Sequence, residues 1–209
     1  MVLNRVLRSE ESIARNVCHE AKSEPKSALR ARLLATREAQ SEQAGQSARN
    51  EALAIRIREV LARHEARCVG VYWPVAGEFD ARDAVARWLA VDESRGAALP
   101  VVVTPHARMV FHAWRADTPM KEGRYRIPVP AEEVVVVPDL LLIPCVGFDS
   151  DRYRLGYGGG YYDRTLAAWP NGARPVTIGI AYESGRSRAL PRETHDMPLD
   201  AIVTESAIY

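Results

Sequence analysis

The residues best suited to chemistry form a glycine-rich stretch in the second half of the chain, Arg154-Leu-Gly-Tyr-Gly-Gly-Gly-Tyr-Tyr-Asp-Arg164. It follows the apolar run Leu140–Ile143, which is typical of a central strand covered on both faces. Ligands of open α/β sheets bind beyond the carboxyl ends of the strands, and glycines let backbone N–H groups approach phosphate oxygens. A helix beginning at Tyr161 would add the partial positive charge of its N-terminus. The stretch predicts a phosphate site, with a ligand-free tight turn as the plainer alternative.

Two charged side chains flank these glycines. Arg154 offers a planar fork for a phosphate, and Asp163 offers oxygen atoms of the kind that magnesium prefers. The stretch matches neither common phosphate fingerprint, because Tyr161 occupies the third glycine position of a dinucleotide motif and the chain has no Gly-Lys-Ser/Thr triplet. The sequence therefore predicts a phosphate loop of a more particular kind.

A second candidate element is a row of cations near the start of the chain. Lys26, Arg30 and Arg37 are spaced by four and seven residues, which places them on about one face of a helix. Neighbouring like charges repel one another, so an anion opposite them would be stabilising. A solvated basic face is the alternative.

A third candidate is the acidic turn Trp73-Pro-Val-Ala-Gly-Glu-Phe-Asp80, at the end of the first expected strand. The turn would place Glu78 or Asp80 at the same sheet edge as the glycines, where a carboxylate could accept hydrogen bonds from an amino-heterocycle. A helix N-cap or a solvated turn is the alternative.

Other kinds of site are poorly supported. His19-Glu20 and His64-Glu65 each lack the second histidine of a zinc motif, and no Gly-x-Ser-x-Gly elbow occurs. Cys145 lies at the end of an apolar run, which favours a core position over a nucleophile.

Composition excludes several classes of partner. The chain has 209 residues with 28 Lys+Arg and 27 Asp+Glu, so its charge gives no basis for nucleic-acid or membrane binding. No apolar run approaches the roughly 18 residues of a membrane helix. Three distant cysteines indicate reduced thiols, and Glu10 and Glu11 interrupt any leader-like segment, so we expect a cytoplasmic protein. Small-molecule substrates and a monomeric state are expected.

The elements that must position these residues begin after a polar extension, residues 1–23, and we expect a single domain over residues 24–209. Helix formers and apolar spacing predict helices over 25–40, from about 46 to 64, 83–90 and 161–168. Short β-branched runs predict strands over 68–73, 98–103, 109–114, 140–143, 176–181 and 202–203, with 134–137 as strand or loop and Pro100 as an obstacle to its strand. Alternating strands and helices predict an α/β layered sheet with a largely parallel core.

Taken together, the motifs resemble the 5-formyltetrahydrofolate cyclo-ligase family. The resemblance rests on Lys26-x-x-x-Arg30, Gly77-Glu-Phe-Asp80, Pro144…Phe148-Asp149 and the eleven residues from Arg154 to Arg164. The segments 178–183 and 195–205 also look like the family's end. Tyr153, Ala81 and Arg126 depart from the usual pattern, in which glycine, threonine and glycine are common. None of these departures removes a charged group.

The resemblance implies a three-layer α/β/α fold similar to the sugar-phosphate isomerase and coenzyme A transferase type. It also implies an ATP- and Mg²⁺-dependent cyclisation of 5-formyltetrahydrofolate to 5,10-methenyltetrahydrofolate, with ADP and phosphate released. Lys26, Arg154 and Asp163 would be catalytic, and Asp163 and Asp196 would hold the metal. The ATP site would comprise Lys26, Arg30, Arg154, Leu155, Gly156, Tyr157, Gly158, Gly159, Gly160, Tyr161 and Tyr162. The folate site would comprise Trp73, Glu78, Tyr125, Tyr157, Gly158, Gly159, Gly160 and Tyr161.

Two other classes of function stay open at this point. A sugar-phosphate isomerase on a related fold would need no ATP and would not require Lys26. A non-catalytic regulator would bind nucleotide or folate without turnover.

Overall fold

The computed structural model describes residues 24–172, 174–194 and 196–209; the expected extension, residues 1–23, lies outside the described residues. The described part holds four α-helices, and the sequence predicted each of them to within a few residues. They are α1 (Lys26–Ser41), α2 (Gln46–Arg63), α3 (Arg82–Leu89) and α4 (Tyr161–Ala167). No helix in this part of the chain is both long and apolar enough to cross a membrane.

Seven of the described strands form one mixed sheet in the order β11-β10-β7-β1-β2-β3-β6. Pairing is parallel from β11 to β2 and antiparallel from β2 through β3 to β6, so the largely parallel core is confirmed. The strands are β1 (Cys68–Gly70), β2 (Gly96–Val101), β3 (Val110–Ala113), β6 (Val135–Val136), β7 (Leu140–Pro144), β10 (Val176–Ile180) and β11 (Ala201–Val203).

Strand β7 lies in the middle of the parallel part, between β1 and β10. In the register, Leu140 is opposite Val69 on β1 and Val176 on β10. Leu140 through Ile143 are all fully buried, as a strand covered on both faces requires. The residues that follow β7 therefore emerge at the centre of the sheet's carboxyl edge.

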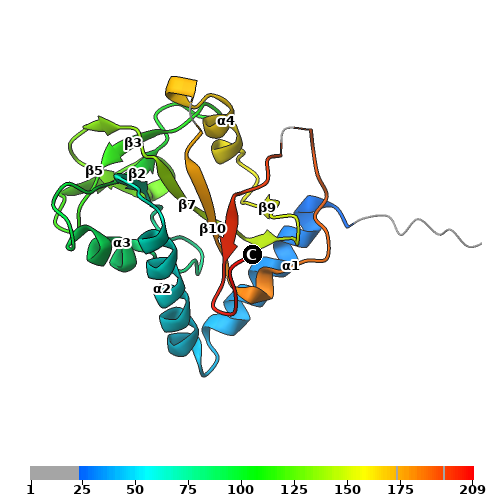
Figure 1. Ribbon diagram of the computed structural model, residues 1–209. Helices are drawn as coiled ribbons and strands as arrows, with labels where there is room; N and C mark the ends of the chain where they lie inside the picture. The colour runs from blue at the N-terminus through cyan, green and yellow to red at the C-terminus, as the bar shows by residue number, and fades with distance from the viewer. Residues whose placement is uncertain (1–23, 173, 195) are drawn as a thin grey trace, which may run out of the picture.

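Helices cover both faces of the sheet, and Figure 1 shows α2 and α3 together on one side with α4 on the other. Side chains of α2 and α3, such as Leu53 and Trp88, share one core cluster with Leu140 and Leu142. Leu166 of α4 belongs to a second cluster with Leu141 and Ile143. These two clusters are the faces of a three-layer α/β/α arrangement.

Helix α1 packs elsewhere. Its buried leucines Leu29 and Leu33 form a third, small cluster with Val146, Leu155 and Leu190. These partners belong to the segments beyond the carboxyl ends of the strands. Helix α1 is therefore positioned at the edge where the sequence predicts the site.

Two short ribbons were not predicted from the sequence. One pairs β4 (Met120–Glu122) with β5 (Pro128–Pro130), and the other pairs β8 (Gly147–Phe148) with β9 (Arg154–Leu155). Arg154 and Leu155 therefore lie on a strand, and the glycine loop proper begins at Gly156.

The sequence left open whether Pro100 interrupts its strand, and in the structure Pro100 lies within β2. The β1 pairing of strand β2 ends at Ala98, whereas Pro100 is opposite Phe111 on the other neighbour, β3. Because that side of β2 is unpaired at this point, the missing N–H of Pro100 costs no ladder bond to β1.

Candidate active site

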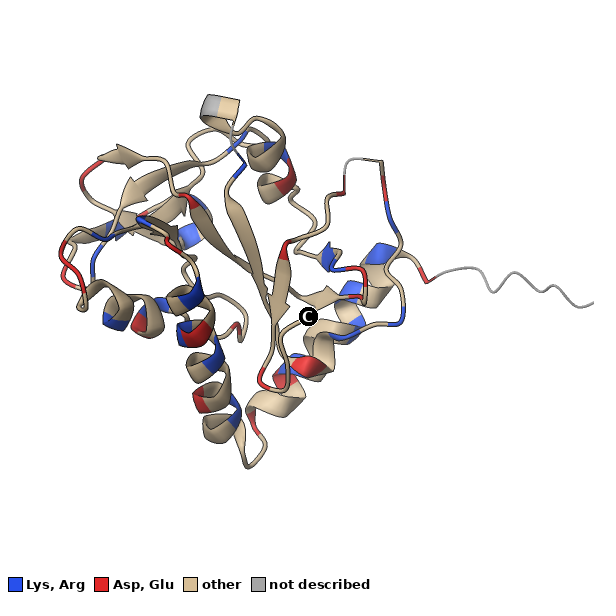
Figure 2. Ribbon diagram, viewed as in Figure 1, with Lys and Arg blue, Asp and Glu red and all other residues tan. Residues whose placement is uncertain are grey.

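The basic face of α1 lies directly against the glycine loop. Nε of Arg30 donates a hydrogen bond to the backbone carbonyl of Gly156 at 2.6 Å. A Cβ atom on Gly158 would lie only 3.3 Å from the Arg30 guanidinium. In Figure 2, part of the α1 ribbon beside β9 has the colour of Lys and Arg. Two segments 126 residues apart are thus brought together, as the resemblance implied.

Backbone conformation explains two of the loop's glycines. Gly158 has φ +90° and Gly160 has φ +62°, the left-handed region that side chains rarely adopt. Gly160 is the residue from which α4 begins, and Arg164 of that helix donates back to the carbonyl of Gly159. The loop is therefore fixed at its end by its own helix.

Lys26, in the first turn of α1, reaches a distant segment of the chain. Its Nζ lies 2.7 Å from Asp196 Oδ2 and 3.0 Å from Glu193 Oε1. The backbone N–H of Glu193 also donates to Asp196, at 2.7 Å. The sequence named Lys26 and Asp196 as site residues, and the structure places them in contact. Glu193 was not predicted from the sequence, because its segment has neither periodicity nor a motif.

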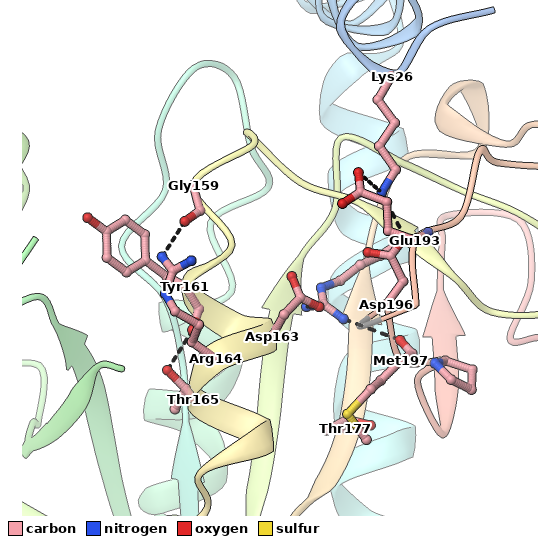
Figure 3. A network of polar contacts seen from close by, with 12 residues as sticks. Lys26, Gly159, Tyr161, Asp163, Arg164, Thr165, Thr177, Glu193, Asp196 and Met197 are labelled. Atoms are coloured by element: carbon pink, nitrogen blue, oxygen red, sulfur yellow. Dashed lines mark hydrogen bonds and ion pairs between the residues drawn. The ribbon is translucent and has the colours of Figure 1, made fainter. Parts of the chain in front are cut away.

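Arg154 and Asp163, the two charged flanks of the glycines, form an ion pair. Nη2 of Arg154 lies 2.6 Å from Asp163 Oδ1, and the Arg154 side chain is only 6% exposed. In Figure 3, Asp163 points to the side where Lys26, Glu193 and Asp196 meet, whereas Tyr161 points the other way. The glycine loop and α4 therefore lie between two sides of the site. The charged side carries Asp163, Lys26, Glu193 and Asp196, and the aromatic side carries Tyr161.

The charged side carries the two carboxylates that the resemblance assigns to magnesium, Asp163 and Asp196. No group of three or more His, Cys, Asp or Glu suited to a metal occurs among the described residues. Mg²⁺ commonly needs only one or two carboxylates, with waters and substrate phosphates completing its shell. Asp163 and Asp196 supply carboxylates of that kind, each beside a cation of the chain.

On the aromatic side, the rings of Tyr125 and Tyr161 meet edge to face, with centroids 6.2 Å apart. Their hydroxyl oxygens lie 2.6 Å from each other. Tyr125 belongs to the short 3-10 helix Arg124–Arg126, and both Tyr125 and Arg126 have positive φ, of 60° and 58°. Arg126 stands where the family more often has glycine, and the left-handed backbone there accounts for that preference.

The acidic turn separates its two carboxylates. Asp80 forms an ion pair with the Arg82 side chain at 2.6 Å and accepts a hydrogen bond from the Arg82 backbone N–H. Because Arg82 is the first residue of α3, Asp80 helps to fix the start of that helix. The Arg82 guanidinium also stacks on Trp73, 3.7 Å from the ring centroid. Glu78 instead turns inward, which favours it as the carboxylate of the site.

Glu78 is held in an unusual environment. One oxygen, Oε2, accepts the backbone N–H of Val75 at 2.9 Å, while the buried Oε1 accepts no hydrogen bond from the described residues. Burial raises the pKa of Glu78 to about 7, although the Val75 N–H, the charge of Arg37 and the nearby Tyr157 hydroxyl act in the opposite direction. A carboxyl that titrates near neutrality at a sheet edge is typical of a functional group.

The remaining predicted residues are divided between the loop and the core. The hydroxyl of Tyr157 contacts Arg37, which is buried at the end of α1's basic row. Tyr162 packs against the second core cluster and Leu155 is buried in the small cluster beneath α1. Cys145 is buried and its pKa is raised to about 12 by burial, in keeping with a core role.

A buried carboxylate that was not singled out from the sequence holds the segment carrying Asp196. Asp149 is fully buried and accepts hydrogen bonds from the backbone N–H of Tyr153 and Leu190, and from the side chain of Arg192. Its place in the Phe148-Asp149 motif was the available signal, but the pattern alone does not show what it binds.

With this geometry in place, the chain was compared with known proteins. Residues 22–205 match the profile described as the 5-formyltetrahydrofolate cyclo-ligase family. A 5-formyltetrahydrofolate cyclo-ligase of Haemophilus influenzae is 33% identical over 168 residues, covering 77% of this chain and 84% of that protein. One of Escherichia coli is 32% identical over 151 residues, covering 69% and 81%.

Solved structures agree with these relatives. The 5,10-methenyltetrahydrofolate synthetase of Aquifex aeolicus superposes with a TM-score of 0.72 at 27% identity, covering 88% of this chain and 91% of that one. A 5,10-methenyltetrahydrofolate synthetase from Mycoplasma pneumoniae gives 0.68 at 26% identity, covering 87% and 99%.

Proposed function

The chain belongs to the 5-formyltetrahydrofolate cyclo-ligase family and has that family's activity, which implies the use of ATP, and on this premise we propose how its residues divide the reaction. The charged side of the glycine loop binds the triphosphate of ATP. The side that carries Glu78 and the tyrosines binds 5-formyltetrahydrofolate. The loop between them brings the γ-phosphate to the formyl oxygen.

The chemistry requires the γ-phosphate to lie against the formyl oxygen. The formyl carbon of an amide is a poor electrophile, and its oxygen does not leave as hydroxide. Transfer of the γ-phosphoryl group to the formyl oxygen releases ADP and creates a leaving group. The N-10 amine then attacks the activated carbon, loses its proton, and phosphate departs as the ring closes. Such a transfer depends chiefly on positioning and on electrostatic stabilisation of the phosphoryl oxygens.

The cations that would receive the phosphates already surround the loop. Arg30 contacts Gly156, Arg154 stands on β9 directly before the glycines, and Lys26 lies at the first turn of α1. Lys26, Arg30 and Arg154 with the loop 155–162 form the ATP site in this proposal. The Lys26–Asp196 and Arg154–Asp163 pairs place each cation beside a carboxylate.

Asp163 and Asp196 would hold Mg²⁺, which supplies positive charge to the phosphate oxygens when it is bound. Before it binds, the two carboxylates are balanced by Arg154 and Lys26. The chain's own part in this step is to hold both carboxylates on the phosphate side of the loop.

The folate would lie against Trp73, Tyr125, Tyr161 and the loop residues Tyr157 to Gly160. Aromatic faces at Trp73 and the Tyr125–Tyr161 pair suit flat heterocycles and a benzoyl ring. Glu78 would accept hydrogen bonds from amino groups of the heterocycle, for which its Oε1 has no competing donor among the described residues.

The single observation that carries this proposal is the contact of Arg30 with Gly156, because it joins the family's two phosphate motifs into one site. The experiment mixes the protein with 5-formyltetrahydrofolate, ATP and magnesium and follows the ultraviolet band of the methenyl product. Product that depends on ATP supports the proposal. Turnover of a sugar phosphate without ATP would point to an isomerase, and ligand binding without product would point to a regulator.

A further inference from the structure

Arg37 is a buried arginine for which the proposed reaction gives no role. Arg37 is only 6% exposed. Its Nη2 donates a hydrogen bond at 2.5 Å to the backbone carbonyl of Cys145, which directly follows the central strand β7. Nη1 donates to the Tyr157 hydroxyl at 3.2 Å. It forms no ion pair within 4.0 Å with any of the described carboxylates.

Three parts of the site converge on this side chain. Helix α1 carries it, the glycine loop supplies Tyr157, and the acidic turn packs over it, since a Cβ on Gly77 would lie 3.5 Å from Arg37 Cδ. Arg37 and Glu78 also line one small cavity, together with Cys145 and Tyr182. A buried cation and a half-buried carboxylate therefore line the same cavity without forming a direct pair.

We propose that Arg37 is a positioning residue of the folate site, which holds the Tyr157 hydroxyl and supplies the positive charge that keeps Glu78 ionised to receive the substrate. This role rests on the proposed function, in which Glu78 accepts hydrogen bonds from the folate heterocycle. An ionised carboxylate accepts on both oxygens, whereas a protonated one gives up part of that capacity.

The other groups that face Glu78 cannot substitute for this charge. They come from β1 and its continuation, from the end of β7, from the glycine loop and from α4: Tyr72, Cys145, Tyr157 and Tyr162. Burial raises the pKa of each of these four groups, so all are neutral near pH 7. Burial also raises the pKa of Tyr182, which lines the same cavity. Among the described residues, the charge acting on Glu78 is that of Arg37.

The test measures the titration of Glu78 directly, in the full chain without substrates. The carboxyl carbon of Glu78 is followed by NMR from pH 5 to 9 and assigned by its loss in Glu78→Gln. We expect the midpoint, about 7 in the parent protein, to move upward by about one pH unit in Arg37→Gln. Arg37→Lys keeps the charge, so its Glu78 midpoint should stay close to that of the parent protein. Tyr157→Phe should raise the midpoint by a smaller amount, because the Tyr157 hydroxyl itself lowers the pKa of Glu78, and this variant measures that direct contribution separately from the charge of Arg37.

The second readout is the KM for 5-formyltetrahydrofolate across the same pH range. In Arg37→Gln the rise in KM at low pH should begin about one pH unit higher, and the same substitution in a Glu78→Gln background should shift nothing further. An unchanged Glu78 midpoint in Arg37→Gln would overturn the proposal, and so would a KM shift that persists in the double variant. Should the glutamine variant not fold, Arg37→Lys decides the outcome by NMR, because a midpoint raised by about one pH unit despite the retained charge would overturn the proposal.

These results remain distinct from a failure of the proposed function. Absence of methenyl product in the parent protein would refute the reaction, whatever the NMR midpoints show. A normal parent reaction with an unmoved Glu78 midpoint would refute the role of Arg37 alone.

Discussion

Arg154 and Asp163 flank the glycines in the sequence and neutralise each other in the structure, with 2.6 Å between Nη2 and Oδ1. The guanidinium that would bind a phosphate and the carboxylate that would bind a metal are therefore held in one place before either ligand arrives. A charge change at one residue must affect the other.

Asp163→Asn should reduce the magnesium-dependent rate by roughly tenfold or more, because asparagine keeps the shape and removes the charge that holds the cation. Steady-state rates at saturating ATP, measured over a range of magnesium concentrations, check this. Asp83→Asn is the matched control, since Asp83 pairs with Arg87 on the exposed surface of α3. A rate within about twofold of the parent would remove Asp163 from the metal site.

Lys26→Ala should weaken ATP binding more than folate binding. Loss of one charge-assisted phosphate contact costs roughly 1.5–3 kcal/mol, which is about ten- to a hundredfold in affinity. Separate titrations with ATP and 5-formyltetrahydrofolate measure the two effects. Arg32→Ala provides the control, because Arg32 lies on the same helix and pairs with Glu24 in an exposed position. Equal loss of both affinities would show that Lys26 serves only to anchor the segment of Glu193 and Asp196.

Asp149→Asn should lower the free energy of unfolding by about 1–3 kcal/mol, because it weakens the hydrogen bonds that three backbone N–H groups and Arg192 donate to this buried side chain. Urea denaturation gives the value. Asp151 pairs with the same arginine from a 61% exposed position, so Asp151→Asn should change the free energy by at most about 1 kcal/mol. Similar losses in the two variants would argue against a special role for the buried carboxylate.

Glu78→Gln should stabilise the protein increasingly as pH rises from about 5 to 8. The pKa of Glu78 is raised from 4.5 to about 7 by burial, so the folded state binds a proton more tightly than the unfolded state in this interval. The stability contributed by protonated Glu78 is therefore lost as pH rises through 7, by up to about 3 kcal/mol. Urea midpoints at each pH measure the gain from glutamine. Glu59→Gln, which changes an exposed carboxyl on α2, is the matched control.

Removal of residues 1–23 should leave activity close to that of the full chain, because the family match begins at residue 22 and α1 begins at Lys26. The extension is also polar and offers little apolar surface to bury. Assays of the truncated and full chains under the same conditions make the comparison. A tenfold lower activity in a soluble truncated protein would mean that the extension completes the site.

The elements predicted correctly from sequence are those with a strong local pattern. Leu140–Ile143 is a buried central strand because four consecutive apolar residues fit no exposed structure, and the leucine stripe of α1 fits a helix docked on one side. The ribbons β4–β5 and β8–β9 were missed because strands of two or three residues have no periodicity to detect.

The site shows the same division. Helical spacing places the cations of α1 on one face, whereas their encounter with the glycine loop was implied by the family resemblance, which assigns both to the ATP site. The contact of Lys26 with Asp196 spans 170 residues and depends on how Asp149 and Arg192 fix the last segment. Nor does spacing show that Arg37, about two turns beyond Arg30, is buried against Cys145.

Helix α1 is attached to the protein through a small apolar cluster of its own, formed by Leu29 and Leu33 with Val146, Leu155 and Leu190. Local opening of a protein follows such boundaries, because elements with little buried apolar contact separate at a lower free energy than the core. Release of α1 would withdraw Lys26, Arg30 and Arg37 together. In the proposed function, a polyanion bound by Lys26 and Arg30 would therefore favour the docked helix by mass action. Occupation of that proposed phosphate site and docking of α1 would then be thermodynamically linked.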